Sequence, residues 1–268
     1  MKRKLLVNLI FISLLILFSS CSDDFWFDFL LGPQPKFIDD NEFTPGLSIL
    51  GVIRPDSIDS EPLSYILVEK LIAAVNTEPD SFNIVDAQVM VFKINDNVIV
   101  DSFEFVFDTT QLFPSIYRPV DFQPQAGDSY TIRCRKEGLP ELTASTTVPN
   151  VPAIENDLIT VTANKVQFSI LSHPSASLYD VFLFSGNYPI MKRVLKDQNG
   201  STFIEIILNE SLDENAFVII YAYDANLSSY VTAPNIFIKP NTYRPPFSNV
   251  TGGYGCFGSM NILVRNIN

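Results

Sequence analysis

Imidazole chemistry has one candidate residue in this sequence, because His173 is the only histidine. A metal site built from several histidines is therefore excluded. A Ser-His-Asp triad would have to use His173, which lies in His173-Pro174-Ser175, a segment typical of a turn. No serine stands in a Gly-x-Ser-x-Gly nucleophile elbow. We expect an exposed turn histidine and assign no catalytic residue.

Thiol chemistry in the body of the chain is limited to Cys134 and Cys256. An oxidising compartment would permit a disulfide between them. They fall in different expected domains, however, and nothing in the sequence brings their Cα atoms within the limit of about 7 Å for a bridge. No Cys-x-x-Cys motif supports zinc binding or thiol exchange. We expect two buried free thiols, with a disulfide as the alternative.

The 30 carboxylates could include the pair of a glycosidase, two groups roughly 5 to 10 Å apart. No spacing in the sequence identifies such a pair. Asp39-Asp40-Asn41-Glu42 offers oxygen ligands but lacks the Asp-x-Asp-x-Asp-Gly spacing of a calcium loop, and a solvated acidic linker explains it better. We therefore assign no metal ligand and expect no cofactor.

The most unusual loop expected is residues 245–258, where prolines, Phe247, Tyr254 and Phe257 alternate with glycines. It lacks the Lys-Ser/Thr ending of a phosphate loop. One interpretation makes its aromatic residues a contact surface for a partner, because exposed apolar clusters often mark interaction sites. The other places them in a groove between two domains. A loop at residues 113–118 is a weaker partner candidate.

The first 20 residues predict a secretory signal peptide. Three basic residues at positions 2–4 precede an apolar run at residues 5–18, which is too short to span a bilayer core of about 20 helical residues. The following Phe18-Ser19-Ser20-Cys21 resembles a bacterial lipobox. We expect cleavage before Cys21 and acylation of this cysteine, which would tether the protein to a membrane. The alternative is a plain signal peptide with an accidental cysteine.

An acylated leader is expected at residues 21–43. Ser22, Asp23 and Asp24 follow the cysteine directly and resemble the surface-export signal of Bacteroidetes lipoproteins, the alternative being a merely solvated leader. Beyond them the leader is rich in aromatic residues, including Trp26. Such a cluster either docks on the parent domain or lies at the membrane interface, where Trp is favoured. We favour docking.

The composition excludes two classes of protein. The chain of 268 residues is 47% hydrophobic, which is enough to bury a core and excludes disorder. Its formal net charge of -12 argues against nucleic-acid binding, which needs a basic surface. Removal of the signal peptide takes three of the 18 basic residues, so that 15 minus 30 leaves -15.

Short runs rich in Val, Ile and Phe, bounded by Pro, Asn, Asp and Gly, predict strands throughout the chain. The expected strands are residues 47–53, 64–75, 85–95, 98–107, 129–136, 142–148, 165–171, 178–185, 202–208, 216–223, 234–238 and 261–268. Asn95-Asp96-Asn97 predicts a hairpin turn, and residues 223–227 could carry one helical turn. The pattern predicts an all-β fold with little helix.

Pro149-Asn150-Val151-Pro152 marks the expected boundary between two consecutive β-sandwich domains of immunoglobulin or fibronectin type III-like type. We expect an N-terminal sandwich at residues 44–149 and a C-terminal, fibronectin III-like sandwich at residues 150–268. The signal peptide, residues 1–20, and the leader precede them.

The chain resembles the Bacteroidetes outer-membrane lipoproteins grouped as domain-of-unknown-function family 4249. The resemblance rests on the lipobox cysteine with its acidic residues, on residues 47–53 (Leu-Ser-Ile-Leu-Gly-Val-Ile), on the strand pair at residues 127–132 and 142–149, and on the glycine motif at residues 246–258. It implies an outer-membrane setting, commonly beside TonB-dependent receptors for nutrient import. It carries no catalytic residue.

The resulting expectation is a non-catalytic lipoprotein, anchored to the outer membrane through N-terminal acyl chains and facing the cell exterior. It would act as an accessory or binding module for a TonB-dependent nutrient receptor. A structural or adhesive surface protein is the alternative, and a secreted hydrolase is less favoured.

Overall fold

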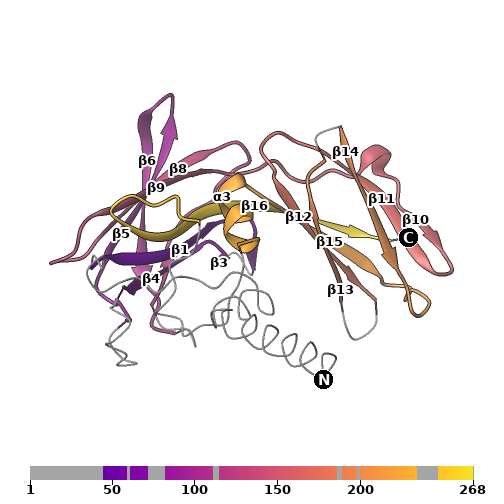
Figure 1. Ribbon diagram of the computed structural model, residues 1–268, viewed down its shortest axis with the longest axis horizontal. Coiled ribbons are helices and arrows are strands. Elements are labelled where there is room, and N and C mark those ends of the chain that lie inside the picture. The colour runs from indigo at the N-terminus through magenta and orange to yellow at the C-terminus, as the bar shows by residue number, and fades with distance from the viewer. Residues whose placement is uncertain are drawn as a thin grey trace, which may run out of the picture.

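The computed structural model describes residues 45–58, 61–71, 82–110, 115–185, 189–197, 200–233 and 247–267 (Figure 1). They form an N-terminal and a C-terminal unit built from strands, with little helix. The N-terminal unit contains β1 (Leu47–Ile53), β2 (Ser57–Ile58), β3 (Glu61–Pro62), β4 (Tyr65–Lys70), β5 (Gln88–Asn95), β6 (Val98–Phe107), β7 (Ile116–Pro119), β8 (Ser129–Arg135) and β9 (Leu142–Thr147).

The C-terminal unit begins with a 3₁₀ turn, η2 (Glu155–Asp157). It continues with β10 (Thr160–Thr162), β11 (Lys165–Leu171), β12 (Leu178–Phe184), β13 (Ile190–Leu195), β14 (Ser201–Ile207), β15 (Phe217–Tyr223), the helix α3 (Ala225–Val231) and β16 (Gly253–Asn266). The expected strand at residues 234–238 lies outside the described residues.

Alternation of buried and more exposed residues is the pattern of strands such as β8, β9 and β11. In β11, Val166, Phe168 and Ile170 are at most 4% exposed, whereas the residues between them are half-buried. Successive side chains of a strand point to opposite faces, so this alternation gives one face to the core. The turn expected at Asn95-Asp96-Asn97 is confirmed. Asp96 and Asn97 have φ of 49° and 63°, the left-handed backbone that a two-residue hairpin requires.

In the N-terminal unit the strand order is β16-β1-β4-β7-β6-β5-β8-β9. The sheet curls back on itself, because Thr143 of β9 exchanges two backbone hydrogen bonds, 2.8 and 2.9 Å long, with Thr251 just before β16. Its strands therefore enclose one core, which contains Ile66, Val91, Ile132 and the ring of Phe257. A sheet closed on itself buries its inner face without a second layer.

The C-terminal unit is a sandwich of two layers (Figure 1). The sheet β10-β11-β14 faces the strands β13-β12-β15-β16 across a core that includes Val166, Tyr179, Ile204 and Ile220. This three-on-four arrangement is fibronectin type III-like. The expected all-β fold of sandwich type with little helix is thus confirmed, and the C-terminal unit has its two separate layers. In the N-terminal unit both sides of the core belong to one closed sheet.

Strand β16 belongs to both units. Its first half, from Gly253 to Ser259, pairs in parallel with β1, and its second half pairs antiparallel with β15. Residues 253–258 were expected to be a loop, and this expectation was wrong, because β1 supplies a complete hydrogen-bonding neighbour for them. If the chain is divided between residues 149 and 150, β16 falls in the C-terminal unit, although its first half also completes the N-terminal sheet.

Candidate functional site: the junction between the units

The junction has a small apolar cluster of its own. Val52 of β1, Leu227 of α3, and Cys256 and Met260 of β16 are at most 9% exposed and contact one another. Tyr65, Tyr221, Tyr223, Tyr230 and Phe247 are partly buried around them. In Figure 1, α3 lies between the two units, next to β16. The helix therefore covers the point where the shared strand passes from one sheet to the other.

Asp224 is the polar centre of this junction and is 6% exposed. Its Oδ1 accepts a hydrogen bond of 2.7 Å from the backbone N–H of Leu227, which makes it the N-cap of α3. Its Oδ2 accepts one of 2.5 Å from the hydroxyl of Thr146, in β9 of the other unit. Burial raises the pKa of Asp224, and the hydrogen bonds of this carboxylate offset only part of that rise.

Further polar contacts cross the junction. The side-chain amide of Asn261 donates to the carbonyl of Pro149 at 2.9 Å, and Asn226 of α3 donates to the carbonyl of Ser145 at the same distance. The hydroxyl of Ser259 donates to the carbonyl of Thr147 at 2.8 Å. Each bond joins residues far apart in the chain. Together with the shared strand they hold the two units in one orientation.

A cleft of about 540 Å³ opens beside this contact. The wall formed by the N-terminal unit carries two pairs of hydroxyls, each pair joining β8 to β9. The oxygens of Ser129 and Thr147 are 2.8 Å apart, and so are those of Thr131 and Ser145. The opposite wall includes Ser175 and Asn226. The volume lies within the range of ligand pockets, but the walls are more polar than those of most drug-sized sites. The cleft therefore suits a polar ligand or a polar surface of a partner.

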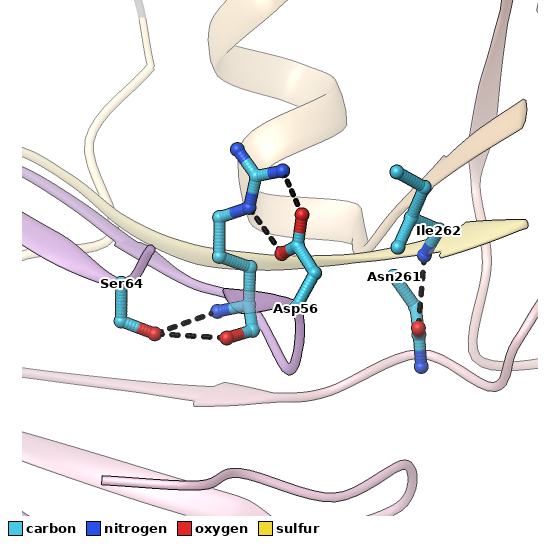
Figure 2. Close-up of polar contacts among 5 residues, drawn as sticks. Asp56, Ser64, Asn261 and Ile262 are labelled. Carbon is cyan, nitrogen blue, oxygen red and sulfur yellow. Dashed lines mark hydrogen bonds and ion pairs between the residues drawn. The ribbon is translucent and has the colours of Figure 1, made fainter. Parts of the chain in front are cut away.

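Arg54, just after β1, contacts both units at the junction. Arg54 forms an ion pair with Asp56 (Figure 2). Its backbone N–H donates to the hydroxyl oxygen of Ser64, and this hydroxyl donates to the backbone carbonyl of Arg54, both at 3.0 Å. Its guanidinium carbon also lies 5.9 Å from the ring centre of Tyr221, in the other unit. Figure 2 also shows Asn261, whose side-chain oxygen accepts from the backbone N–H of Ile262.

A second buried charge is paired on the C-terminal side. Asp180, 2% exposed, receives two hydrogen bonds of 2.7 Å from Arg193 and one of 3.1 Å from the hydroxyl of Tyr223. Arg193 also donates to the carbonyl of Val231, the last residue of α3. This bidentate pair satisfies the buried carboxylate and ties the end of the helix to the C-terminal sheet.

The structure places the three aromatic residues of the expected partner loop apart from one another. Phe257 is fully buried in the N-terminal core, with its ring over Gly51 of the neighbouring strand, and it offers no surface to a partner. Phe247 packs into the junction cluster, as the groove interpretation expects. Tyr254 is half-buried in β16, opposite Ser48. In the weaker candidate loop, Tyr117 is buried and its hydroxyl donates to the carbonyl of Ile84.

The cysteines and the histidine lie where they were expected. Cys134 belongs to the N-terminal core and Cys256 to the junction cluster, and both are buried free thiols. Burial raises the pKa of both thiols to about 12, so they stay protonated at neutral pH. His173 is exposed in a turn, where its ring nitrogens lie 2.8 Å from Asn150 Nδ2 and Ser175 Oγ.

Cys21, Ser22, Asp23, Asp24 and the acidic segment at residues 39–42 lie outside the described residues, so acylation and export stay predictions. Within the described ranges, no helix is long and apolar enough to cross a membrane. Nor do three or more His, Cys, Asp or Glu side chains gather as metal ligands in this part of the chain.

Sequence reasoning missed Asp224 and Thr146, the pair that joins the units. Asp224 had a signal as a helix N-cap, since Asp is favoured at that position and lies near the start of residues 223–227, the stretch expected to turn. Thr146 had no such signal, because nothing in the sequence distinguishes it from other strand residues. Its role follows only from the contact of β9 with Asp224 at the start of α3.

Comparison with protein-family models found no match, and comparison with curated proteins found none either. Among solved structures, a segment of two fibronectin type III domains from chicken tenascin is 16% identical, with a TM-score of 0.23, over 67% of this chain and 90% of that one. The first three such domains of chicken CNTN1 are 14% identical, with a TM-score of 0.27, over 66% of this chain and 59% of that one.

A third structure, β-glucuronidase 3 of Bacteroides uniformis, is 14% identical, with a TM-score of 0.20, over 68% of this chain and 23% of that one. TM-scores this low carry no argument about function. The fold assignment rests on the strand order and on the two cores.

Proposed function

We propose that the protein is a non-catalytic binding module, tethered to the outer membrane through Cys21 and facing the cell exterior, that assists a TonB-dependent nutrient receptor. The observation that supports it best is the polar cleft between two units that share β16. A shared strand keeps the cleft walls at a fixed separation, and a preformed site loses less entropy on binding than a hinged one. The family resemblance supplies the membrane setting and the receptor as partner.

The anchor is tested separately from the binding role. The wild-type protein should incorporate labelled palmitate and partition into detergent, and Cys21→Ala should abolish both. A wild-type protein that stays unlabelled and water-soluble would contradict the anchor without bearing on the cleft.

The binding role is tested at the cleft wall. Ser145 is exposed there, so Ser145→Arg should fill the cleft and weaken co-purification with the receptor from solubilised outer membranes by about tenfold, or about 1.4 kcal/mol. Thr160→Arg, an exposed strand position in the other layer of the C-terminal unit, is the matched control and should have no effect. Equal co-purification of the two variants would contradict a role for the cleft.

A structural or adhesive role is the second candidate, and β6 favours it. Val98, Ile99 and Val100 are 62%, 48% and 54% exposed. Of the residues of β6, only 105–107 pair with β7, so within the described ranges this edge of β6 has no strand beside its earlier residues. An exposed apolar edge can add a strand from another chain. Val98→Lys should then reduce self-association and leave receptor co-purification unchanged, whereas Ser145→Arg should do the opposite.

A further inference from the structure

The outer side of the four-stranded C-terminal layer carries a continuous apolar surface. Directly paired residues of neighbouring strands point to the same face, and Met191, Phe182, Ile219 and Val264 form one such row across β13, β12, β15 and β16. The next row continues it with Phe184 and Phe217, whose rings stack with centroids 4.8 Å apart and planes at 7°. We call these six residues the aromatic face.

The aromatic face has the composition of a covered surface. Met191 and Val264 are 48% and 55% exposed, and the other four residues are half-buried by one another. The solvent side of an antiparallel sheet is usually polar, yet neither row contains a charged side chain. The outer side of β11 and β14 differs, because the polar cluster of Lys165, Gln167 and Glu205 lies between its exposed apolar residues, Phe203 and Ile207. We therefore infer that another segment or molecule covers the aromatic face.

The face continues an interface that already exists in the molecule. The ring of Phe182 meets that of Tyr221 edge-on at 5.8 Å, and Tyr221 packs against the junction cluster. On the same side of the sheet, α3 and Phe247 cover the rows nearer the N-terminal unit. The junction thus covers one half of this sheet side, and the aromatic face is the other half.

We propose that residues 25–31 of the chain's own leader cover the aromatic face. This segment, Phe-Trp-Phe-Asp-Phe-Leu-Leu, contains six apolar side chains and one carboxylate, so its composition matches the face. A partner segment from the same chain needs no second molecule and loses less entropy than a separate one. The acyl anchor is not required for this contact.

The leader is long enough to reach. Pro45 is 14 positions after Leu31 (45 minus 31), and an extended chain of that length spans about 46–50 Å. Pro45 lies two residues before Leu47, which pairs with Gly253 at the start of β16. Val264 is 11 residues further along that strand (264 minus 253), or about 36 Å. The segment therefore reaches the face without any change in the two units.

The contact has a consequence for orientation. Cys21 lies four residues before Phe25 (25 minus 21), so an acyl chain on Cys21 would start within about 14 Å of the aromatic face. The C-terminal unit would then lie against the membrane, and the N-terminal unit would point away from it.

Trp26 provides the test, because it is the only tryptophan in the chain. In the chain without its signal peptide and carrying Cys21→Ser, its fluorescence should be blue-shifted and weakly quenched by acrylamide. The double variant Ile219→Thr and Val264→Thr keeps β-branched side chains but removes apolar area. It should raise the quenching constant of Trp26 several-fold.

The matched control is the double variant Phe203→Thr and Ile207→Thr, since these residues are 59% and 58% exposed on the outer side of the opposite layer. It should leave the quenching of Trp26 unchanged. Circular dichroism on both variants checks that the strands are intact.

Four outcomes would overturn the proposal. Trp26 could be as accessible in the folded wild type as in urea, or its protection could survive the double variant at Ile219 and Val264. Protection that disappears on dilution would assign the face to a second copy of the chain. Protection that arises only with phospholipid vesicles would assign the segment to the membrane.

Discussion

Asp224 combines three roles in one buried carboxylate. It caps α3, it accepts a hydrogen bond from Thr146 in the other unit, and its backbone N–H donates to the carbonyl of Ser259 in β16 at 3.0 Å. A buried carboxylate is stable only where hydrogen bonds replace its hydration. The position therefore couples the helix, the shared strand and the N-terminal sheet.

The pKa of Asp224 gives a prediction about pH. Because burial raises this pKa in the folded protein, the stabilisation from protonation is complete below the unfolded value of about 3.9 and is lost as the pH rises through the folded value. Asp224→Asn removes the titration and keeps the cap. From about pH 4 to pH 7, the free energy of unfolding of the wild type should therefore fall relative to that of this variant. Urea denaturation at several pH values measures the difference.

A constant difference across this range, or one of opposite sign, would contradict the raised pKa. Asp224→Ala is a control for the cap itself. It should be less stable than Asp224→Asn by about 1–2 kcal/mol at every pH, because alanine cannot accept the hydrogen bond from Leu227.

At the scale of elements, β16 depends on a close approach to β1. Gly255 has a φ of +107°, and a Cβ atom there would lie 1.9 Å from the carbonyl oxygen of Ile49. Only glycine combines this backbone conformation with so short a distance. The glycine-rich motif is therefore a requirement of strand pairing rather than a ligand loop.

Gly255→Ala should lower the free energy of unfolding by about 2–5 kcal/mol, through backbone strain and displacement of β1. Gly138→Ala is the matched control. Gly138 also has a positive φ, +79°, but no atom lies within 4 Å of the position of its Cβ, so about 1–2 kcal/mol is expected. Chemical denaturation compares the two, and equal losses would show that the contact with β1 adds nothing.

At the scale of the molecule, the two units complete each other. Removal of β16 would take Phe257 from the N-terminal core and the edge strand from the C-terminal sheet. The segment between the units is also packed, since Pro149 and Pro152 are buried. The chain therefore has two cores but one interlocked sheet system, and unfolding should be a single cooperative transition.

A cut between the units tests this directly. Val151 is 51% exposed, so a protease site inserted before it should be cleaved in the native state. The two fragments should still elute together in size-exclusion chromatography, because β16 remains paired with β1, and they should separate in urea. Fragments that separate under native conditions would contradict the interlocked arrangement. The uncut insertion variant is the control.

Local patterns in the sequence determined much of this protein. The strands at residues 47–53, 98–107 and 165–171 were predicted to the residue, because they are runs of Val, Ile, Leu and Phe bounded by Pro, Asn, Asp or Gly. The hairpin turn at Asp96 and the exposed turn at His173 also followed from local preferences. Strands without a clear local pattern were not predicted. In β13, Lys192 and Arg193 interrupt the apolar residues, and β7 and β10 are only four and three residues long.

The tertiary structure alone decided how the two halves meet. Nothing near Gly253 indicates that it pairs with Leu47, more than 200 residues earlier (253 minus 47), and the burial of Phe257 and the role of Thr146 follow from that pairing. Local propensity describes how a segment prefers to bend and which face it buries. The choice of partner depends on the packing free energy of the whole sheet, which no short segment of sequence encodes.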